Sequence, residues 1–480
     1  MEHIVEPSRS VPVLAKTAVV VVGSGPSGMI AAIASARAGA ETMLVERYGQ
    51  IGGYFSNRPG GGFGLAFHDA DGNQIIRGVP WELVDRVLAA GGGVPPKEMI
   101  NRSDFGWPPK TAYGKDRPNL DFESVKTTAF QMMEEDGVTL LLHAYGVGAV
   151  VEDGAVKGII IESKSGRQAV LAKVVVDATG DADIAAQAGA PFEKASRDVL
   201  YQVQRCYRLG NVDTERIRQE IKRNLEEYTD VSYPADEMAI PAGFQSSITA
   251  AVVPEGSRKI TSEDGTSYFI SRSNVTAGRS TQRRGMAVGI RPGTGTVIAA
   301  AEADATDVED LTKAELDIRK QVVEGVRWLR DNAPGYENCY LMGMGEAEQL
   351  GVRETRRIVG EYTLTEDDIT GGRKFDDSIG KSANSIDMHL HKGDVDVRGV
   401  RGYHDIPYGT LVPKQIDNIL AAGRCISATH VAEAATRKVP VCMVTGQAAG
   451  VAAALSARAG VAPRGLSVSE VQKTLKDLGN

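Results

Sequence analysis

The sequence predicts an α/β fold built on a parallel β-sheet, and three observations near the N-terminus support this prediction. Residues 18–22 form a continuous apolar run, Ala-Val-Val-Val-Val, which suits a strand buried on both faces. A glycine-rich turn and an Ala-rich stretch of helical length follow, and this stretch ends at Gly39. A second apolar run, residues 42–45, then ends in Glu46. Strand, turn, helix and strand in this order are typical of a Rossmann-like unit.

The turn between the first strand and the helix carries the pattern G-x-G-x-x-G at Gly23, Gly25 and Gly28. Gly23 permits the tight turn, Gly25 lets the backbone approach a pyrophosphate, and Gly28 allows close packing of helix and strand. The helix N-terminus adds unpaired N–H groups and a partial positive charge. Glu46 stands where an acid accepts hydrogen bonds from an adenosine ribose. These residues predict a site for NAD or FAD, against the alternative of a glycine-rich turn without a ligand.

Composition and charge exclude several classes of function. The chain has 480 residues, with 42% hydrophobic residues and a net charge of −8. It contains no basic block, so we expect no nucleic-acid partner. The four cysteines show no C-x-x-C spacing, which argues against a disulfide framework or a structural zinc site. Because the sequence contains neither a signal-peptide pattern nor an apolar run long enough to span a membrane, we expect a soluble cytoplasmic protein without membrane contact.

Segments beyond Glu46 decide between the two nucleotides. The longest of them are "GVRETRRIVGEYTLTEDDI" (351–369), "IPYGTLVPKQIDNILAAGRCISATH" (406–430) and "GQAAGVAAAL" (446–455). On these blocks the chain resembles the bacterial FAD-dependent oxidoreductase family of the glutathione-reductase-like flavoprotein class. It is more distantly similar to fumarate-reductase-type flavoproteins and thiazole-synthesis enzymes. The resemblance implies FAD as the cofactor.

The resemblance also implies which residues bind FAD. The pyrophosphate turn comprises Gly23, Ser24, Gly25, Pro26, Ser27 and Gly28, the adenosine ribose meets Glu46 and Arg47, and Gly52 and Gly53 lie near the pyrophosphate and ribitol. Farther along the chain, Val147 lies near the adenine, Ala178, Thr179, Gly180 and Asp181 lie on the adenosine side, and Gly423 and Arg424 meet the ribitol and phosphates. The last helix, starting near 439–445, contributes Thr445, Gly446 and Gln447. Its positive N-terminal end would face the flavin pyrimidine edge, where it would stabilise the reduced flavin.

FAD-binding segments at both ends of the chain imply a discontinuous domain. We predict a flexible N-terminus at 1–14, a Rossmann-like FAD-binding domain at 15–200 and 400–480, and an inserted α+β substrate domain at 201–399. Within the inserted domain, residues 199–213 suit a strand, and residues 310–334 suit a long amphipathic helix capped by Asp310 or Thr312. No second nucleotide cradle is visible in the sequence, because "GTGTVI" (293–298) lacks the third glycine and suits a turn and strand. We therefore expect the unidentified electron donor or acceptor to meet the flavin directly.

Two candidate catalytic residues lie in the middle of the chain. Arg353, in "GVRETRRIVGEY", could clamp a carboxylate, whereas the structural alternative is an ion pair with Glu354 or Glu361. Asp387 and His389 alternate, so on a strand they would share a face. His389 then suits an acid/base catalyst, with a satisfied structural histidine as the alternative. The pair has no third ligand in sight, so we predict no metal site.

Three further candidates lie toward the C-terminus. Tyr403 and His404, in "RGYHDIPYG", either line the substrate site or cover a strand edge. Arg437, in "THVAEAATRKVP", directly precedes the last helix and is expected close to the flavin. Lys438 beside it adds a cation that departs from the family pattern, and we expect it to alter substrate specificity.

The predicted function is that of an FAD-dependent oxidoreductase that transfers a hydride between flavin N5 and a small organic substrate. The Arg and His candidates favour an anionic or hydroxylated substrate. One alternative is a flavin oxidase or monooxygenase that uses O2, and another is a non-catalytic flavin-binding assembly protein. The sequence leaves a homo-oligomer, the direction of the reaction and covalent attachment of the flavin open.

Overall fold

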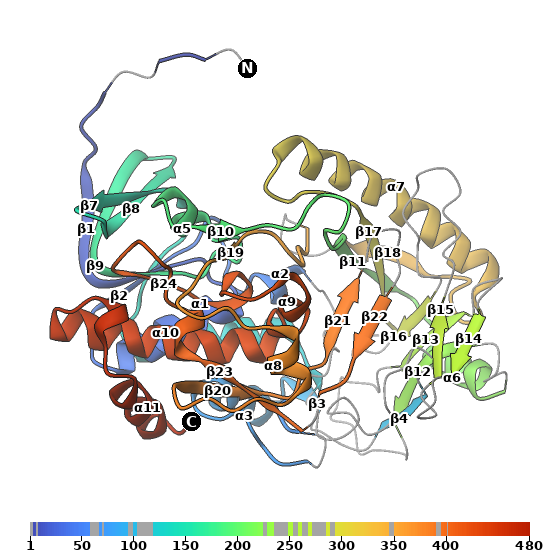
Figure 1. The fold of residues 1–480 in the computed structure, drawn as a ribbon. Helices are drawn as coiled ribbons and strands as arrows, with labels where there is room; N and C mark the ends of the chain where they lie inside the picture. The colour runs from blue at the N-terminus through green and yellow to red at the C-terminus, as the bar shows by residue number, and fades with distance from the viewer. Residues whose placement is uncertain are drawn as a thin grey trace.

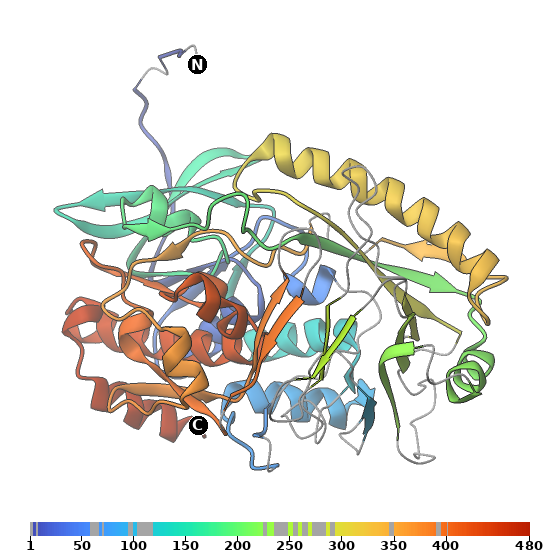
Figure 2. The same ribbon diagram turned by 45° about the vertical axis from the view of Figure 1, so that its right-hand side comes forward.

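A computed structural model describes most of the chain. The described residues are 3–5, 8–57, 67–69, 72–94, 99–102, 119–223, 228–234, 248–252, 258–261, 267–270, 285–288, 293–344, 350–389, 395–400 and 402–480. The N-terminal segment extends away from the body of the molecule (Figures 1 and 2). The first strand begins at Val13, two residues before the predicted domain boundary.

A mixed sheet with a parallel centre forms the first half of the molecule. Its strands are β1 (Val13–Val22), β2 (Thr42–Val45), β6 (Thr139–Leu141), β7 (Tyr145–Glu152), β8 (Ala155–Ser163), β9 (Gly166–Asp177) and β24 (Ile419–Ala421). Their order is β6-β2-β1-β9-β8-β7, with β24 also paired to β9. The inner half of β1 is buried between β2 and β9, both parallel to it, which explains its unbroken apolar run. Because β24 pairs in parallel with β9, both ends of the chain contribute to one sheet.

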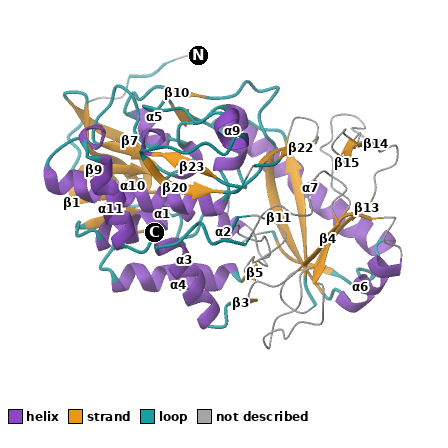
Figure 3. Cartoon of the chain, turned by 60° about the horizontal axis from the view of Figure 1, so that its bottom comes forward, coloured by secondary structure: helices purple, strands orange, loops and turns teal. Residues whose placement is uncertain are grey.

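Helices cover this sheet and contribute apolar side chains to the hydrophobic core. They are α1 (Pro26–Arg37), α2 (Tyr54–Asn57), α3 (Val79–Ala89), α4 (Phe122–Glu135), α5 (Asp183–Gln187), α10 (Val439–Ala459) and α11 (Val468–Asp477). Figure 3 shows α1, α3, α4, α10 and α11 gathered on one side of the molecule. By length and composition α10 could cross a membrane, but in this fold its most apolar window is entirely buried. It begins at Val439, within the predicted range.

A second, antiparallel sheet forms the other half of the molecule (Figure 2). Its strands are β4 (Met99–Arg102), β11 (Val203–Gly210), β12 (Tyr228–Pro234), β13 (Ile248–Val252), β16 (Gly285–Val288), β17 (Gly295–Ala301) and β18 (Tyr340–Gly343). The helix α7 (Val308–Asn332) packs on β17 and β11, and α6 (Thr214–Arg223) follows β11. Strand β4 belongs to this sheet although its residues fall inside the predicted range 15–200, because it pairs with β12.

The remaining described elements are short. They are the strand pairs β3 (Gly93–Val94) with β5 (Asn119–Leu120), β10 (Phe192–Glu193) with β19 (Arg357–Ile358), β14 (Arg258–Thr261) with β15 (Ser267–Ile270), β20 (Ser378–Ser382) with β23 (His404–Pro407) and β21 (Ile386–His389) with β22 (Val395–Arg398), and the helices η3 (Tyr408–Thr410), α8 (Glu366–Thr370), η4 (Gly423–Cys425), α9 (His430–Thr436) and η5 (Pro463–Gly465). Figure 1 shows β21 and β22 between the two halves.

The secondary structure tests several local predictions. The strand predicted within 199–213 is β11, and the turn and strand predicted at 293–298 lead into β17, so both are confirmed. The helix predicted at 310–334 is also confirmed as α7. Its predicted caps are wrong, because the side chain of Asp307 accepts the N–H groups of Glu309 and Asp310.

Candidate active site

The turn after β1 is shaped by two glycines that the protein's own packing requires. Gly23 has φ +93°, and a Cβ at this position would lie 2.7 Å from the carbonyl oxygen of Ala178. A Cβ on Gly28 would lie 1.8 Å from the carbonyl oxygen of Gly23. Because backbone atoms occupy both places, neither residue can be larger than glycine without a shift of the strand or the helix.

Gly25 differs from these two glycines, because no described atom of the protein would clash with a larger residue there. Its backbone is ordinary, with φ −63° and ψ −178°, and an added Cβ would meet nothing within 4 Å. Gly25 is the N-cap of α1, and no side-chain hydrogen bond caps this helix in the described chain. An open backbone surface at a helix N-terminus is what an approaching pyrophosphate requires. The turn therefore fits the FAD pyrophosphate.

The acid predicted to meet the ribose lies beside this turn. Glu46 is 6% exposed, and its Oε2 accepts the backbone N–H of Ser24 at 2.8 Å and the Ser24 hydroxyl at 2.6 Å. Its Oε1 accepts the N–H of Tyr48 at 3.0 Å. The Arg47 guanidinium lies 5.0 Å from the ring centroid of Tyr48. Glu46 thus holds the turn in shape, while its contact with a ribose stays a prediction.

The second predicted glycine pair, Gly52 and Gly53, packs against the same turn. The N–H of Gly52 donates to the carbonyl oxygen of Ser24 at 2.9 Å. A Cβ on Gly53 would lie 2.8 Å from the Cα of Gly25. The pair therefore lies against the pyrophosphate turn. Val147 lies farther along the sheet, at a register shift where β7 pairs with β8.

Two predicted segments that are far apart in sequence meet at an ion pair. Arg424 Nη2 lies 2.6 Å from Asp181 Oδ1, which also accepts the hydroxyl of Thr355 at 2.7 Å. Gly180 has φ +81°, and a Cβ there would lie 2.9 Å from Arg424 Nη2. The structure thus brings residues 178–181 together with 423–424.

The last helix packs against α1 through glycines. A Cβ on Gly446 would lie 2.2 Å from the carbonyl oxygen of Ser27, and the N–H of Gly423 donates to Thr445 Oγ1 at 3.0 Å. Gln447 lies in a different environment, because its Oε1 accepts the N–H of Val79 at the start of α3, at 2.7 Å. This buried contact gives Gln447 a structural role, while its contact with FAD stays a prediction.

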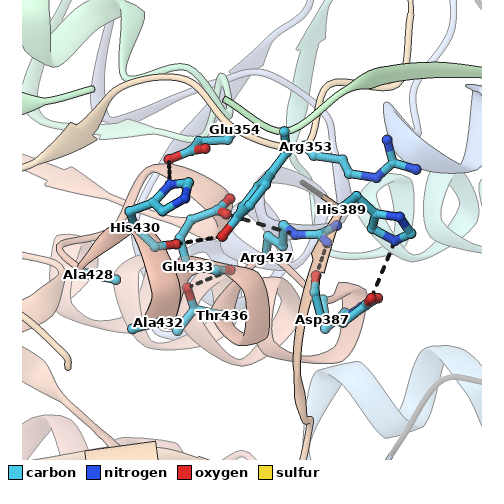
Figure 4. Close-up of polar contacts among 12 residues, drawn as sticks. Arg353, Glu354, Asp387, His389, Ala428, His430, Ala432, Glu433, Thr436 and Arg437 are labelled. Atoms are coloured by element: carbon cyan, nitrogen blue, oxygen red, sulfur yellow. Dashed lines mark hydrogen bonds and ion pairs between the residues drawn. The ribbon is translucent and has the colours of Figure 1, made fainter. Parts of the chain in front are cut away.

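Basic side chains gather where α10 begins, around one strand of the β21–β22 pair (Figure 4). Lys438, the N-cap of α10, forms an ion pair with Asp387. Arg437 Nη2 donates to the carbonyl oxygen of Asp387 at 2.6 Å. His389 Nε2 lies 3.4 Å from Asp387 Oδ1, so the prediction that these two side chains share a strand face is confirmed. Although burial opposes it, the charges of Lys438 and His389 hold the pKa of Asp387 well below its usual value.

The arginines of residues 353–357 have separate partners. Arg353 is buried and donates to the carbonyl oxygen of Gln202 and to the side chain of Gln204. The ion pair with Glu354 that we considered for Arg353 is made by Arg357 instead. In Figure 4 the side chains of Arg353, His389 and Arg437 extend in the same direction from three segments of the chain.

Tyr403 and His404 lie in another environment. The ring centroid of Tyr403 lies 3.2 Å from Lys374 Nζ and 5.1 Å from Lys381 Nζ. His404 is fully buried in β23, and burial lowers the pKa of its imidazole to about 3. A neutral, enclosed imidazole is unsuited to proton transfer near neutral pH, so the structure argues against a catalytic role for His404.

His430 and Glu433, which the sequence also places beside Arg437 and Lys438, lie next to the basic cluster, but sequence reasoning missed that Glu354 and Tyr201 meet them there. His430 Nδ1 lies 2.7 Å from Glu354 Oε1, and the hydroxyl of Tyr201 donates to the carbonyl oxygen of His430 at 2.9 Å. Glu433 lies on the same helix as His430 and is completely buried. No sequence signal joins Tyr201 or Glu354 to "THVAEAATRKVP", because the three segments are far apart in the chain.

Replacing Asp387 by Asn is expected to lower the free energy of unfolding at neutral pH by about 3 kcal/mol, because Lys438 loses a buried partner. The pKa of Asp387 lies below the value of about 3.9 expected in the unfolded chain, so its stabilisation is present above that pH. It is lost as the pH falls through the folded-state pKa. We therefore expect urea unfolding at pH 7, 5, 4 and 3 to show that the difference in free energy of unfolding between the wild type and D387N disappears only in acid.

Asp317→Asn is the matched control, because Asp317 is 46% exposed and 3.9 Å from Lys320. We expect this surface change to shift stability by less than about 1 kcal/mol. Equal free energies of unfolding for the wild type and D387N at pH 7 would contradict the buried ion pair.

Comparison with known proteins identifies a matching family and several solved structures with a similar fold. A family model described as FAD dependent oxidoreductase matches residues 18–475. A geranylgeranyl bacteriochlorophyll reductase-like protein from Thermoplasma acidophilum has a similar structure at 12% identity and a TM-score of 0.46, covering 96% of this chain and 84% of that chain. The p-nitrophenol 4-monooxygenase of Pseudomonas putida DLL-E4 is similar at 12% identity and a TM-score of 0.46, covering 97% and 84%. A myxobacterial chondrochloren halogenase is similar at 13% identity and a TM-score of 0.43, covering 96% and 78%. The comparison with curated proteins found no match.

Proposed function

The chain belongs to the FAD dependent oxidoreductase family, and from this premise we propose that it oxidises or reduces a small organic anion held near the N-terminus of α10. When bound, FAD supplies hydride chemistry at flavin N5. The turn around Gly25 would hold its pyrophosphate, with Glu46 beside the ribose. The membership of the narrower glutathione-reductase-like class stays a prediction.

One observation carries the proposal, namely the gathering of Arg437, Lys438 and the Asp387–His389 pair at the start of α10. Guanidinium and ammonium groups recognise carboxylates and other oxyanions. The N-terminus of α10 adds partial positive charge to the same region. These groups support an anionic substrate more than a neutral one.

We assign the proton transfer to His389. Asp387 Oδ1 lies 3.4 Å from His389 Nε2 and would orient the imidazole ring for proton transfer with the substrate. Arg437 and Arg353 would hold the substrate's charged group. The burial of this region by β21 and α9 would limit the access of water.

The oxygen-using alternative, an oxidase or monooxygenase, remains beside the main proposal and is separated from it by experiment. The FAD-loaded protein is mixed anaerobically with a panel of small carboxylates and hydroxy acids, each paired with its neutral amide or ester. We expect flavin absorbance to bleach with anionic members only. Air is then admitted. Slow reoxidation supports a dehydrogenase or reductase, whereas fast reoxidation with peroxide or a hydroxylated product supports the alternative.

Bound FAD that dithionite reduces but no panel compound does would favour a non-catalytic flavin-binding protein. A colourless purified protein that gains no thermal stability from added FAD would contradict the assignment of the cradle.

His389→Gln is expected to slow anaerobic flavin reduction by about 10²- to 10⁴-fold, the usual size of general acid–base catalysis. The FAD content should not change, because His389 lies outside the pyrophosphate turn. His3→Gln, in the exposed N-terminal segment, serves as the control and should behave like the wild type. Equal rates for H389Q and wild type across pH 6 to 9 would show that another group moves the proton.

A further inference from the structure

Glu433 is a buried carboxyl group with an unusual environment. It lies in α9, its side chain is 0% exposed, and none of the described groups hydrogen-bonds to either of its oxygens. Within the described part of the chain its ion-pair contact is with Arg437, where Nε and Oε2 are 3.9 Å apart. That separation is too long for a hydrogen bond.

Charged and titratable groups act on Glu433 from several segments of the chain. They are Glu354 and Arg357 from the segment at β19, Arg424 from η4, Arg437 at the C-cap of α9, Tyr201 from the segment before β11, and Cys442 from α10. Arg357 pairs with Glu354, and Arg424 pairs with Asp181. These two cations are therefore largely compensated by carboxylates other than Glu433.

The environment favours the neutral acid. An ionised carboxylate without hydrogen bonds is costly to bury. Burial, opposed by the charge of Arg437, raises the pKa of Glu433 to about 8. Because Asp387 is already paired with Lys438 and His389, no carboxylate among the described residues is then left to compensate Arg437 alone near neutral pH. The Arg437 side chain is 11% exposed, so it is partly open to a small ligand.

We propose that Arg437 binds an oxyanion of the substrate, a carboxylate by preference, and that neutral Glu433 behind it leaves this positive charge available. When Glu433 ionises, it compensates Arg437 and weakens the binding of the anion. By the same linkage, a bound anion favours the protonated form of Glu433. The inference deepens the proposed function and rests on it, because the anion is the substrate's own charged group. Glu433 acts through Arg437 and is a positioning residue.

Benzoate is the probe for this site, with benzyl alcohol as its neutral counterpart. Binding to the FAD-loaded protein is followed by flavin absorbance between pH 6 and 9.5. If only the protonated form binds, linkage makes the Kd rise by about tenfold between pH 7 and pH 9. We expect E433Q to bind benzoate with a Kd that is flat over this range, because the amide cannot ionise. R437Q should lose at least about tenfold in affinity at pH 7.

Glu361→Gln is the matched control, since Glu361 is 43% exposed and pairs with Arg464 away from α9. It should keep the wild-type pH profile. A profile of E433Q that rises with pH as the wild type does would overturn the role of Glu433. Benzoate binding that is unaffected in R437Q would overturn the anion site, even where FAD binding and flavin reduction remain as proposed.

A measurement on the wild type keeps the inference testable if E433Q does not fold. Infrared spectra of protein labelled with ¹³C-glutamate should contain a carboxylic-acid carbonyl band at pH 7, where ordinary glutamates, with pKa values of about 4.3, are ionised. The band should disappear with a midpoint near pH 8. Its absence at pH 7 would overturn the inference and leave the oxidoreductase assignment untouched.

Discussion

Replacing Gly25 by Ala should abolish FAD binding while leaving the apo protein folded. The backbone at Gly25 is one that alanine adopts readily, and the added Cβ meets no described atom within 4 Å. The same methyl group would stand where the pyrophosphate approaches the N-terminus of α1. We expect the Kd for FAD to rise by at least about 100-fold, or about 2.7 kcal/mol, measured by flavin fluorescence quenching. The urea unfolding curve of the apo protein should move by less than about 0.5 kcal/mol.

Gly28→Ala is the contrasting variant of the same turn. Its Cβ would lie 1.8 Å from the carbonyl oxygen of Gly23, so strand and helix must move apart. We expect a loss of about 3 kcal/mol in the free energy of unfolding of the apo protein. FAD binding by G25A at wild-type affinity would show that the pyrophosphate lies elsewhere.

Replacing Gly450 by Ala should destabilise the protein strongly, because this glycine lets α10 contact α1. The added Cβ would lie 2.2 Å from the carbonyl oxygen of Ala31, a backbone atom in the middle of a buried helix. Since both helices lie in the core beside the first sheet, they must separate or shift along each other. We expect a loss of about 2–4 kcal/mol in the free energy of unfolding, measured by urea denaturation.

Gly465→Ala provides the control for this substitution. An added Cβ there meets nothing within 4 Å, so we expect a change of less than about 0.5 kcal/mol. If G450A unfolds at the same urea concentration as G465A, the close contact between α1 and α10 is not a determinant of stability. FAD affinity is a further readout. Gly446 packs against Ser27 of the pyrophosphate turn in the same helix pair, so separating the helices in G450A should also lower the affinity for FAD.

The parts of the fold that the sequence predicted are those governed by local rules. The apolar run of β1, the turn at Gly23 and the helix that follows are specified by adjacent residues, as are the extent of α7 and the start of α10. The Asp387–His389 pair was predictable for the same reason, because alternation along a strand places both side chains on one face. The cap of α7 was mispredicted because Asp310 and Thr312 are also residue types suited to capping, and only the backbone conformation shows that Asp307 is the N-cap.

The sequence by itself therefore determined a Rossmann-like cradle, its cofactor family and the strand pair that carries His389. Only the tertiary structure decided which distant residues meet. Strand β4 belongs to the second sheet because it pairs with β12. The side chain of Gln447 accepts the N–H of Val79 at the start of α3, a buried donor that requires an acceptor. Likewise, Glu433 became a buried acid beside Arg437 only when α9 packed against the segment around Glu354. These outcomes depend on burial and on contacts between residues far apart in the chain, which spacing along a sequence does not encode.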